Sequence, residues 1–323
     1  MTPDPRLARL SRYAWGVLAA TVAVVLWGAY VRATGAGAGC GSHWPRCDGQ
    51  VIPRLASVEQ VIEFTHRVTS GMAFLLVAGL LAWTFRAAPK GHPARLGAVL
   101  SMILMITEAL VGAGLVLLEL VADNRSVARV WWMAAHLTNT FLLLAALALT
   151  AWWASGGRRM RVRGQGEVGW ALLASVALTI CVGITGAITA LGDTLFPKTS
   201  VGLELSSAAH FLERLRVVHP MVAILTGLFV VAMGRVARRL RPSPAVTKLS
   251  TALTLLFAAQ IVGGAVNVVL LAPIWMQLVH LLLADAVWIT LILTTAAALA
   301  EREAETAAPA AHPTSARPLA VGS

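Results

Sequence analysis

Long apolar runs separated by short polar segments dominate the hydropathy pattern of this chain. A helix that crosses a bilayer needs about 20 predominantly apolar residues, and eight runs meet that length. The pattern therefore predicts an all-α integral membrane protein with eight transmembrane helices, at residues 14–33, 61–85, 96–119, 130–153, 167–190, 213–234, 249–271 and 275–299.

The composition agrees with a protein that lies in a lipid bilayer. Of 323 residues, 58% are hydrophobic and only 13% are charged, which excludes a soluble domain of this size. The net charge of +11 would suggest a nucleic-acid partner in a soluble protein. Here the Lys and Arg residues lie between the apolar runs, seventeen on one side and nine on the other. The positive-inside rule then predicts a multi-pass protein of the cell membrane with both termini cytoplasmic and no nucleic-acid partner.

The eight runs also resemble two copies of a four-helix unit. His66 and His219 are 153 residues apart, and His136 and His280 are 144 apart. Because each unit has an even number of helices, the two copies would be parallel in the membrane. We expect two pseudo-symmetric four-helix bundles, at residues 1–155 and 156–300, and a disordered cytoplasmic tail at 301–323.

Four histidines lie near the beginning of alternate helices: His66, His136, His219 and His280. If each follows its helix start by about five residues, the four rings share a depth of roughly 7–8 Å below the outer surface. One histidine in a membrane helix can simply form a hydrogen bond to a neighbouring helix. Four at one depth are better explained as ligands, because ionisable groups are costly in lipid.

Two imidazoles from facing helices can hold a haem iron from both sides. Zinc fits less well, because it takes three or four ligands and no cysteine lies near these histidines. Since two copies of one unit should each carry a complete site, we expect His66 to pair with His136 and His219 with His280.

Charged residues near these histidines have two interpretations each. Arg67, Arg214 and Arg216 are candidates for binding haem propionates or for interfacial snorkelling. Glu63 precedes His66 by three residues and lies on the same helix face. It is either a carboxylate that complements the helix dipole or one that moves protons at the haem edge. Arg216 occupies the equivalent spacing before His219, so only one site has this carboxylate, which suggests one catalytic haem and one electron-carrying haem.

Two cysteines and two further acidic residues leave alternatives open. Cys40 and Cys47 lie in an outer loop, where disulfides persist, and form either a structural disulfide or a redox-active dithiol. Glu108 and Asp285 fall inside predicted spans, where they either line a proton path or pair between helices.

Several of these motifs together resemble those of the haem A synthase family of bacterial membranes. They are Gly28-Ala29-Tyr30-Val31-Arg32-x-Thr34-Gly35-Ala36-Gly37, Cys40 to Cys47 around Trp44-Pro45, Glu63-Phe64-Thr65-His66-Arg67, His136, Val218-His219-Pro220 and His280. The resemblance covers the chain from Tyr13 to about Ala300. One feature fits only a subset of that family, because cysteines occur in the first outer loop and not in loop 191–212.

The resemblance implies an enzyme that oxidises the C8 methyl of haem O to a formyl group, giving haem A for cytochrome oxidase. It implies a haem b cofactor on His219 and His280, and the substrate haem O on His66 and His136. Glu63 would be the essential glutamate. Haem O synthase and cytochrome oxidase assembly factors would be partners.

Two other function classes fit the four histidines. A di-haem b electron-transfer protein would alter neither haem, and a symmetric electron carrier would not require Glu63 on one side only. A haem transporter or chaperone would bind haem transiently and would not retain it on purification.

Overall fold

The structure is a computed structural model that describes residues 4–54, 56–197 and 211–301. In these ranges eight helical stretches are long and apolar enough to cross a membrane, the sixth formed by two helices that together cover Leu212–Leu240. The expected all-α membrane fold with eight spans is therefore confirmed. The helices are α1 (Pro5–Ala33), α2 (Val58–Ala87), α3 (Pro93–Leu117), α4 (Val127–Ala154), α5 (Gly166–Leu195), α6 (Phe211–Leu215), α7 (Val218–Leu240), α8 (Pro244–Val269) and α9 (Ile274–Ala298), with a 3₁₀ turn η1 (Ala36–Ala38) after α1.

Most helices begin earlier than the apolar runs that predict them, because polar caps extend them. The first helix starts at Pro5 rather than at residue 14, with the Asp4 side chain accepting a hydrogen bond from the backbone N–H of Arg6. Ser57 and Ser126 cap α2 and α4 in the same way. Such caps satisfy backbone N–H groups that the first turn of a helix leaves without partners.

These starts change the expected spacing of the histidines. His66, His136 and His280 lie in the second or third turn of α2, α4 and α9, deeper than the five residues assumed from the sequence. His219 differs from them, because it is the second residue of α7, just after the break that follows α6.

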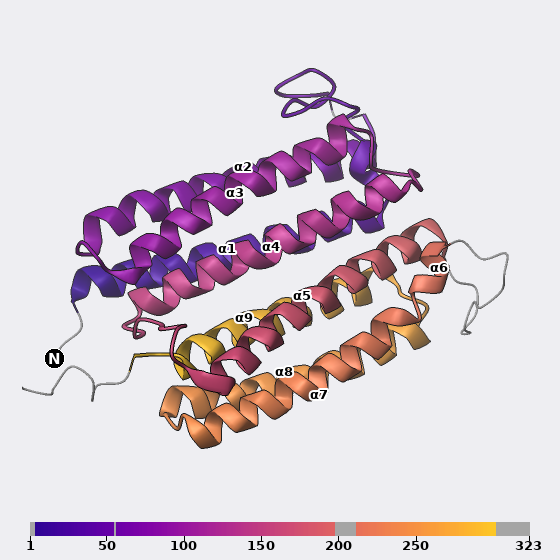
Figure 1. Cartoon of the computed structure of the whole chain (residues 1–323). Coiled ribbons are helices and arrows are strands. Elements are labelled where there is room, and N and C mark those ends of the chain that lie inside the picture. Colours follow the sequence, from indigo (N-terminus) through magenta and orange to yellow (C-terminus); the bar gives the residue numbers. More distant parts are fainter. Residues whose placement is uncertain (1–3, 55, 198–210, 302–323) are drawn as a thin grey trace, which may run out of the picture.

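The helices form two groups that lie side by side (Figure 1). In the first group α1 packs on α2 and α4, and α3 packs on α2 and α4; in the second, α7 packs on α5 and α8, and α9 packs on α8. Helices α1 and α4 face α5 and α9 across the interface, where the Phe141 and Trp288 rings stack with centroids 4.8 Å apart. The indole N–H of Trp288 donates to the carbonyl of Phe141 at 2.7 Å. The division at residue 155 and the pseudo-symmetry of the two groups stay predictions.

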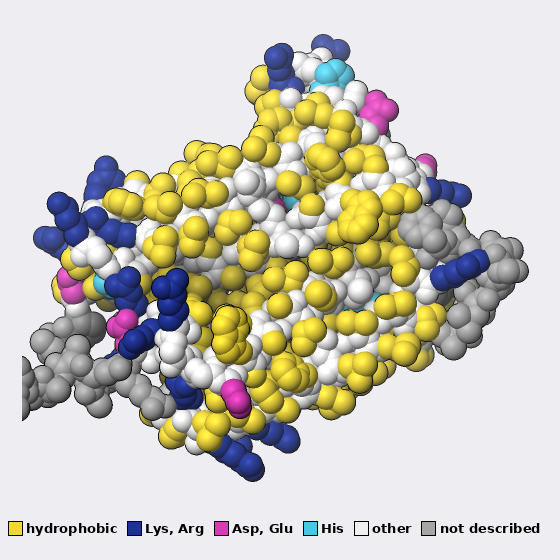
Figure 2. Space-filling model, in the orientation of Figure 1, with side chains coloured by type: hydrophobic (Ala, Val, Ile, Leu, Met, Phe, Trp, Pro, Cys, Tyr) yellow, Lys and Arg dark blue, Asp and Glu magenta, His cyan; other side chains and the backbone are white. Residues whose placement is uncertain are grey.

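The surface supports a membrane location. Hydrophobic side chains cover the middle of the face shown in Figure 2, and Lys and Arg gather toward the ends of the helices. Both described chain ends lie at the same end of the bundle (Figure 1). Which side of the membrane that end faces stays a prediction. The proposed tail after residue 301 and most of loop 191–212 lie outside the described residues.

Candidate functional site

The His66 ring lies directly against a glycine of the neighbouring helix. A Cβ atom added at Gly28 of α1 would lie 3.0 Å from Cε1 and 3.2 Å from Nε2 of His66. Nδ1 of His66 is buried and makes no hydrogen bond. A buried polar nitrogen without a partner is costly, so this ring is suited to a group that it could ligate.

The same arrangement recurs at the other histidines. A Cβ added at Gly186 of α5 would lie 3.0 Å from Cε1 of His219, and one added at Gly264 of α8 would lie 3.1 Å from Cε1 of His280. The contact at His136 is looser, because a Cβ at Gly112 of α3 would lie 3.9 Å from Cε1. Each histidine thus faces a glycine on an adjacent helix. The absence of a side chain at these positions therefore lets each ring lie close to the backbone of the adjacent helix.

Polar contacts of the rings differ between the two helix groups. Thr185 Oγ1 lies 3.1 Å from His219 Nδ1, and Gln260 Nε2 lies 3.3 Å from His280 Nε2. Nδ1 of His136 is buried and makes no hydrogen bond of normal geometry. The pairing of His66 with His136 and of His219 with His280 stays a prediction.

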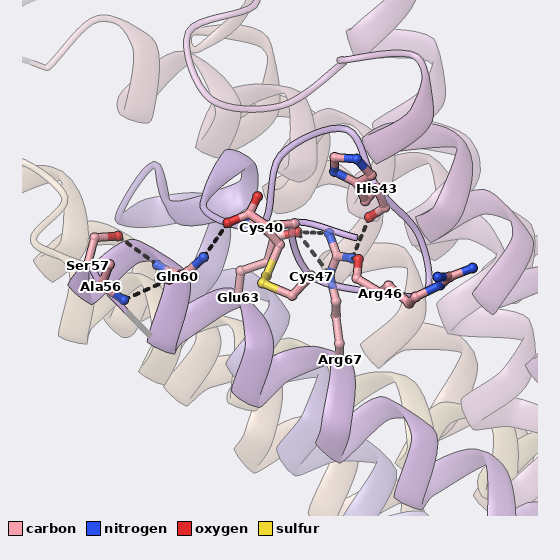
Figure 3. Close-up of a disulfide and its surroundings, with 10 residues drawn as sticks. Cys40, His43, Arg46, Cys47, Ala56, Ser57, Gln60, Glu63 and Arg67 are labelled. Atoms are coloured by element: carbon pink, nitrogen blue, oxygen red, sulfur yellow. Dashed lines mark hydrogen bonds and ion pairs between the residues drawn. A yellow bond between two sulfur atoms is a disulfide. The ribbon is translucent and has the colours of Figure 1, made fainter. Parts of the chain in front are cut away.

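Glu63 lies beneath the loop between α1 and α2 that contains the two cysteines (Figure 3). Only 3% of it is exposed. Its Oε2 accepts a hydrogen bond from the backbone N–H of Cys40 at 2.7 Å, and its Oε1 pairs with the Arg67 guanidinium. Arg67 also donates to the carbonyls of His43 and Arg46. The Glu63 carboxylate is therefore held between its own helix and the loop.

The loop itself is closed by a disulfide between Cys40 and Cys47, both buried. The expected disulfide is thus present in the structure, and the redox-active alternative stays a prediction. Gln60 also fastens the loop to α2, because its amide donates to Asp48 and accepts from the backbone N–H of Ala56 at 2.8 Å. Gly39 allows this close approach, since a Cβ there would lie 2.5 Å from the backbone carbonyl of Glu59.

Comparison of the sequence with those of known proteins identifies its family. The sequence profile of COX15-CtaA, described as cytochrome oxidase assembly protein, matches residues 11–292. The chain belongs to the COX15-CtaA family.

Relatives of the chain have two names. A protein named Protoheme IX farnesyltransferase from Thermus thermophilus is 55% identical over 299 residues, which are 91% of this chain and 49% of the relative. A Heme A synthase from an Exiguobacterium species is 42% identical over 94 residues, 29% of this chain and 31% of the relative. One from Lysinibacillus sphaericus is 39% identical over 106 residues, 32% and 34% of the two chains. The chain thus spans about half the length of the Thermus relative.

In this COX15-CtaA protein the three candidate arginines have different surroundings. Arg67 is engaged with Glu63 and the outer loop. Arg216, 5% exposed, pairs with Asp193 at 3.0 Å and donates to the Gly192 carbonyl at 2.6 Å. Arg214 lies in α6. The contacts show how Arg67 and Arg216 tie neighbouring segments together, and propionate binding stays a prediction for all three.

Sequence reasoning missed the contribution of Arg32 in the last turn of α1. Its guanidinium donates to the Ala190 carbonyl at 2.7 Å and to Thr194 Oγ1 at 2.6 Å in α5. It also donates to Gln277 Oε1 at 2.9 Å in α9. Arg32 therefore joins the first helix group to the second near His280. An arginine inside the apolar motif after Gly28 was a signal for such a role, because a cation at that depth requires partners.

The contacts between glycines and histidines were not predicted from the sequence, because they depend on how the helices pack. The two acidic residues inside the spans have different surroundings. The Glu108 carboxylate accepts hydrogen bonds from Asn139 and Thr140 of α4. Asp285 is 1% exposed, and neither of its carboxylate oxygens has a hydrogen-bond partner.

Proposed function

We propose that this chain is a haem A synthase, an oxidoreductase that converts the C8 methyl of haem O to a formyl group through successive hydroxylations and loss of water. The observation that carries the proposal is the histidine arrangement. Each of the four imidazoles lies against a glycine, and only one of the four, His66, has a carboxylate three residues before it. Membership of a cytochrome oxidase assembly family and relatives named Heme A synthase support the same interpretation.

Each pair would hold one haem. His66 and His136 would bind the iron of the substrate haem O, and His219 and His280 would bind a haem b cofactor. When bound, haem b would supply one-electron redox chemistry between the substrate and an acceptor. The glycines would let the porphyrin faces approach the helix backbones, and the packed helices would exclude water from the oxidised carbon.

Glu63 would act at the substrate site through its carboxylate. A carboxylate can accept protons released when a methyl is oxidised and can stabilise positive charge that develops there. Arg67 and the Cys40 N–H fix its two oxygens, so the outer loop would position the acid. In this arrangement the disulfide-closed loop would contribute to catalysis by holding Glu63 in place, and the cysteine sulfurs would take no part in the chemistry.

The name of the Thermus relatives suggests a second reaction, the transfer of a farnesyl group to protohaem. Transfer of a prenyl diphosphate commonly uses several acidic side chains around a divalent cation. In the described part of this chain no group of three or more His, Cys, Asp or Glu residues could hold a metal ion. A chain about twice as long has room for that activity outside the matched segment. The name nonetheless supports a haem as the molecule acted on.

Pigment extraction tests the proposal. Cells that lack this chain should accumulate haem O and contain no haem A, and the wild-type chain should restore haem A. The Glu63→Ala variant should keep haem b absorption while blocking formyl formation. The exposed Glu59 lies one turn earlier in α2, and Glu59→Ala is the matched control that should form haem A normally. Persistence of haem A in the deletion strain would favour an electron carrier or a chaperone instead.

A further inference from the structure

A second carboxylate lies beside the other histidine of the proposed substrate site. Oε1 of Glu108, on α3, is 3.5 Å from Nδ1 of His136, on α4. That distance is too long for a good hydrogen bond, but His136 Nδ1 is buried and has no other partner. Such contacts are often long until the substrate is bound.

Other side chains hold the Glu108 carboxylate in this position. Asn139 Nδ2 donates to its Oε2 at 2.5 Å, and Thr140 Oγ1 donates to its Oε1 at 2.5 Å. Asn139 also donates to the Leu104 carbonyl at 2.9 Å. These contacts suit an ionised carboxylate, which only accepts hydrogen bonds.

The orientation of the Asn139 amide is itself fixed. Its Nδ2 faces two oxygens that can only accept, Glu108 Oε2 and the Leu104 carbonyl. The amide oxygen therefore faces Thr107, with Oδ1 2.6 Å from the Thr107 hydroxyl. The network runs from Thr107 through Asn139 to Glu108 and ends at His136. Because Asn139 and Thr140 follow His136 by three and four residues, they lie on the same face of α4 as the imidazole.

The second helix group has no such network among its described residues. Gln260 precedes Gly264 by four residues, as Glu108 precedes Gly112, and Gln260 lies beside His280. Gln260 Nε2, however, lies 3.3 Å from Nε2 of His280 and not from Nδ1, which is buried and has no hydrogen-bond partner. The residues three and four positions after His280 are Leu283 and Ala284, neither of which can donate a hydrogen bond from its side chain.

We propose that Glu108 is a positioning residue for His136, accepting a hydrogen bond from its Nδ1–H so that Nε2 is presented to the iron of the substrate haem. Iron-ligating histidines commonly donate their other N–H to a carboxylate, which fixes the ring and strengthens the ligand. The negative charge would stabilise the ferric state at this site relative to the site of His280. The inference rests on the proposed function for the assignment of haem O to His136.

A potentiometric titration of haem in the purified full-length chain tests this role. The chain is loaded with protohaem at both sites, and each absorbance component is assigned by its loss in His136→Ala or His280→Ala. In Glu108→Gln the midpoint potential of the His136 component should become more positive, and its haem affinity should fall by about 10- to 100-fold. The His280 component should not move. Glu108→Asp should restore part of the shift.

Two variants keep the test decisive. Glu108→Asp keeps the charge on a shorter side chain, so the potential of the His136 component should become more positive by only part of the shift seen in Glu108→Gln. Glu119→Gln removes an exposed carboxylate just beyond the end of α3 and should shift neither component. If Glu108→Gln retained no haem at its site, the Glu108→Asp result would decide, because its shorter side chain withdraws the carboxylate from Nδ1 and an unchanged potential of the His136 component would overturn the inference.

The outcomes separate this inference from the proposed function. An unchanged His136 component in Glu108→Gln would show that Glu108 only joins α3 to α4, even if the wild-type chain makes haem A. A shifted component in a chain that makes no haem A would uphold Glu108 as a positioning residue and overturn the proposed reaction.

Discussion

Replacement of Gly28 by alanine tests whether close contact between helix and histidine is needed for haem binding. The new Cβ would lie 3.0 Å from His66 Cε1, whereas ordinary contacts begin at about 3.4 Å. The ring must therefore move by about 0.4 Å, close to the tolerance of about 0.5 Å that a binding constellation allows. Overpacking of this kind costs about 1–3 kcal/mol, and the higher helix propensity of alanine returns about 0.5–1 kcal/mol.

With both ranges taken at their middle, the net loss at the His66 site should be about 1.25 kcal/mol, which corresponds to a roughly 8-fold lower affinity for haem. Gly186→Ala should weaken the His219 site in the same way, since its Cβ would also lie 3.0 Å from that ring. Gly16→Ala is the matched control, because it is in α1 and its Cβ would have no neighbour within 4 Å.

The assay is haem content per protein after purification, resolved into two components by absorbance. Each glycine variant should lose only the component of its own helix group, and Gly16→Ala should retain both. Equal loss of both components in Gly28→Ala would indicate general unfolding. Full retention of both in Gly28→Ala and Gly186→Ala would refute the reasoning.

Three further variants test the contacts around the site. Cys40→Ser with Cys47→Ser opens a loop of eight residues and should lower the free energy of unfolding by about 2.5 kcal/mol, measured by denaturant titration, and an unchanged midpoint would contradict a structural role. Arg67→Ala removes the guanidinium that holds both Glu63 and the loop, so haem A extracted from cells should fall while haem b stays. Arg67→Lys should retain part of the activity. An unchanged amount of haem A in Arg67→Ala would mean that Glu63 does not need this contact. Arg32→Ala removes three hydrogen bonds between the helix groups and should cost about 2 kcal/mol, at about 0.6 kcal/mol for each bond between membrane helices. Thermal unfolding of the purified protein measures that loss, and an unshifted transition would contradict it.

The eight spans could be predicted from hydropathy because lipid forces long apolar stretches into helices. The helix starts could not be taken from hydropathy alone, because α1 begins with a polar turn after Asp4. Capping signals in the sequence do mark the start of α1, since Pro5 directly follows the capping residue Asp4. Pro220 likewise lies in the first turn of α7 and marks the break that places His219 at a helix start.

The site was only partly predictable for a different reason. The disulfide between Cys40 and Cys47 and the spacing of Glu63 to His66 are local in sequence. The contact of Gly28 with His66 and the hydrogen bond from Arg32 to α5 join residues that are far apart along the chain. These depend on which helices pack together, and periodicity does not encode that information.

The pairing of histidines within each helix group is the central claim, and haem content of four single variants tests it most directly. His66→Ala and His136→Ala should each remove the same haem component from the purified full-length chain, and His219→Ala and His280→Ala should each remove the other. If His66→Ala instead removed the component that is lost in His280→Ala, the haem would bridge the two groups and the account would be contradicted.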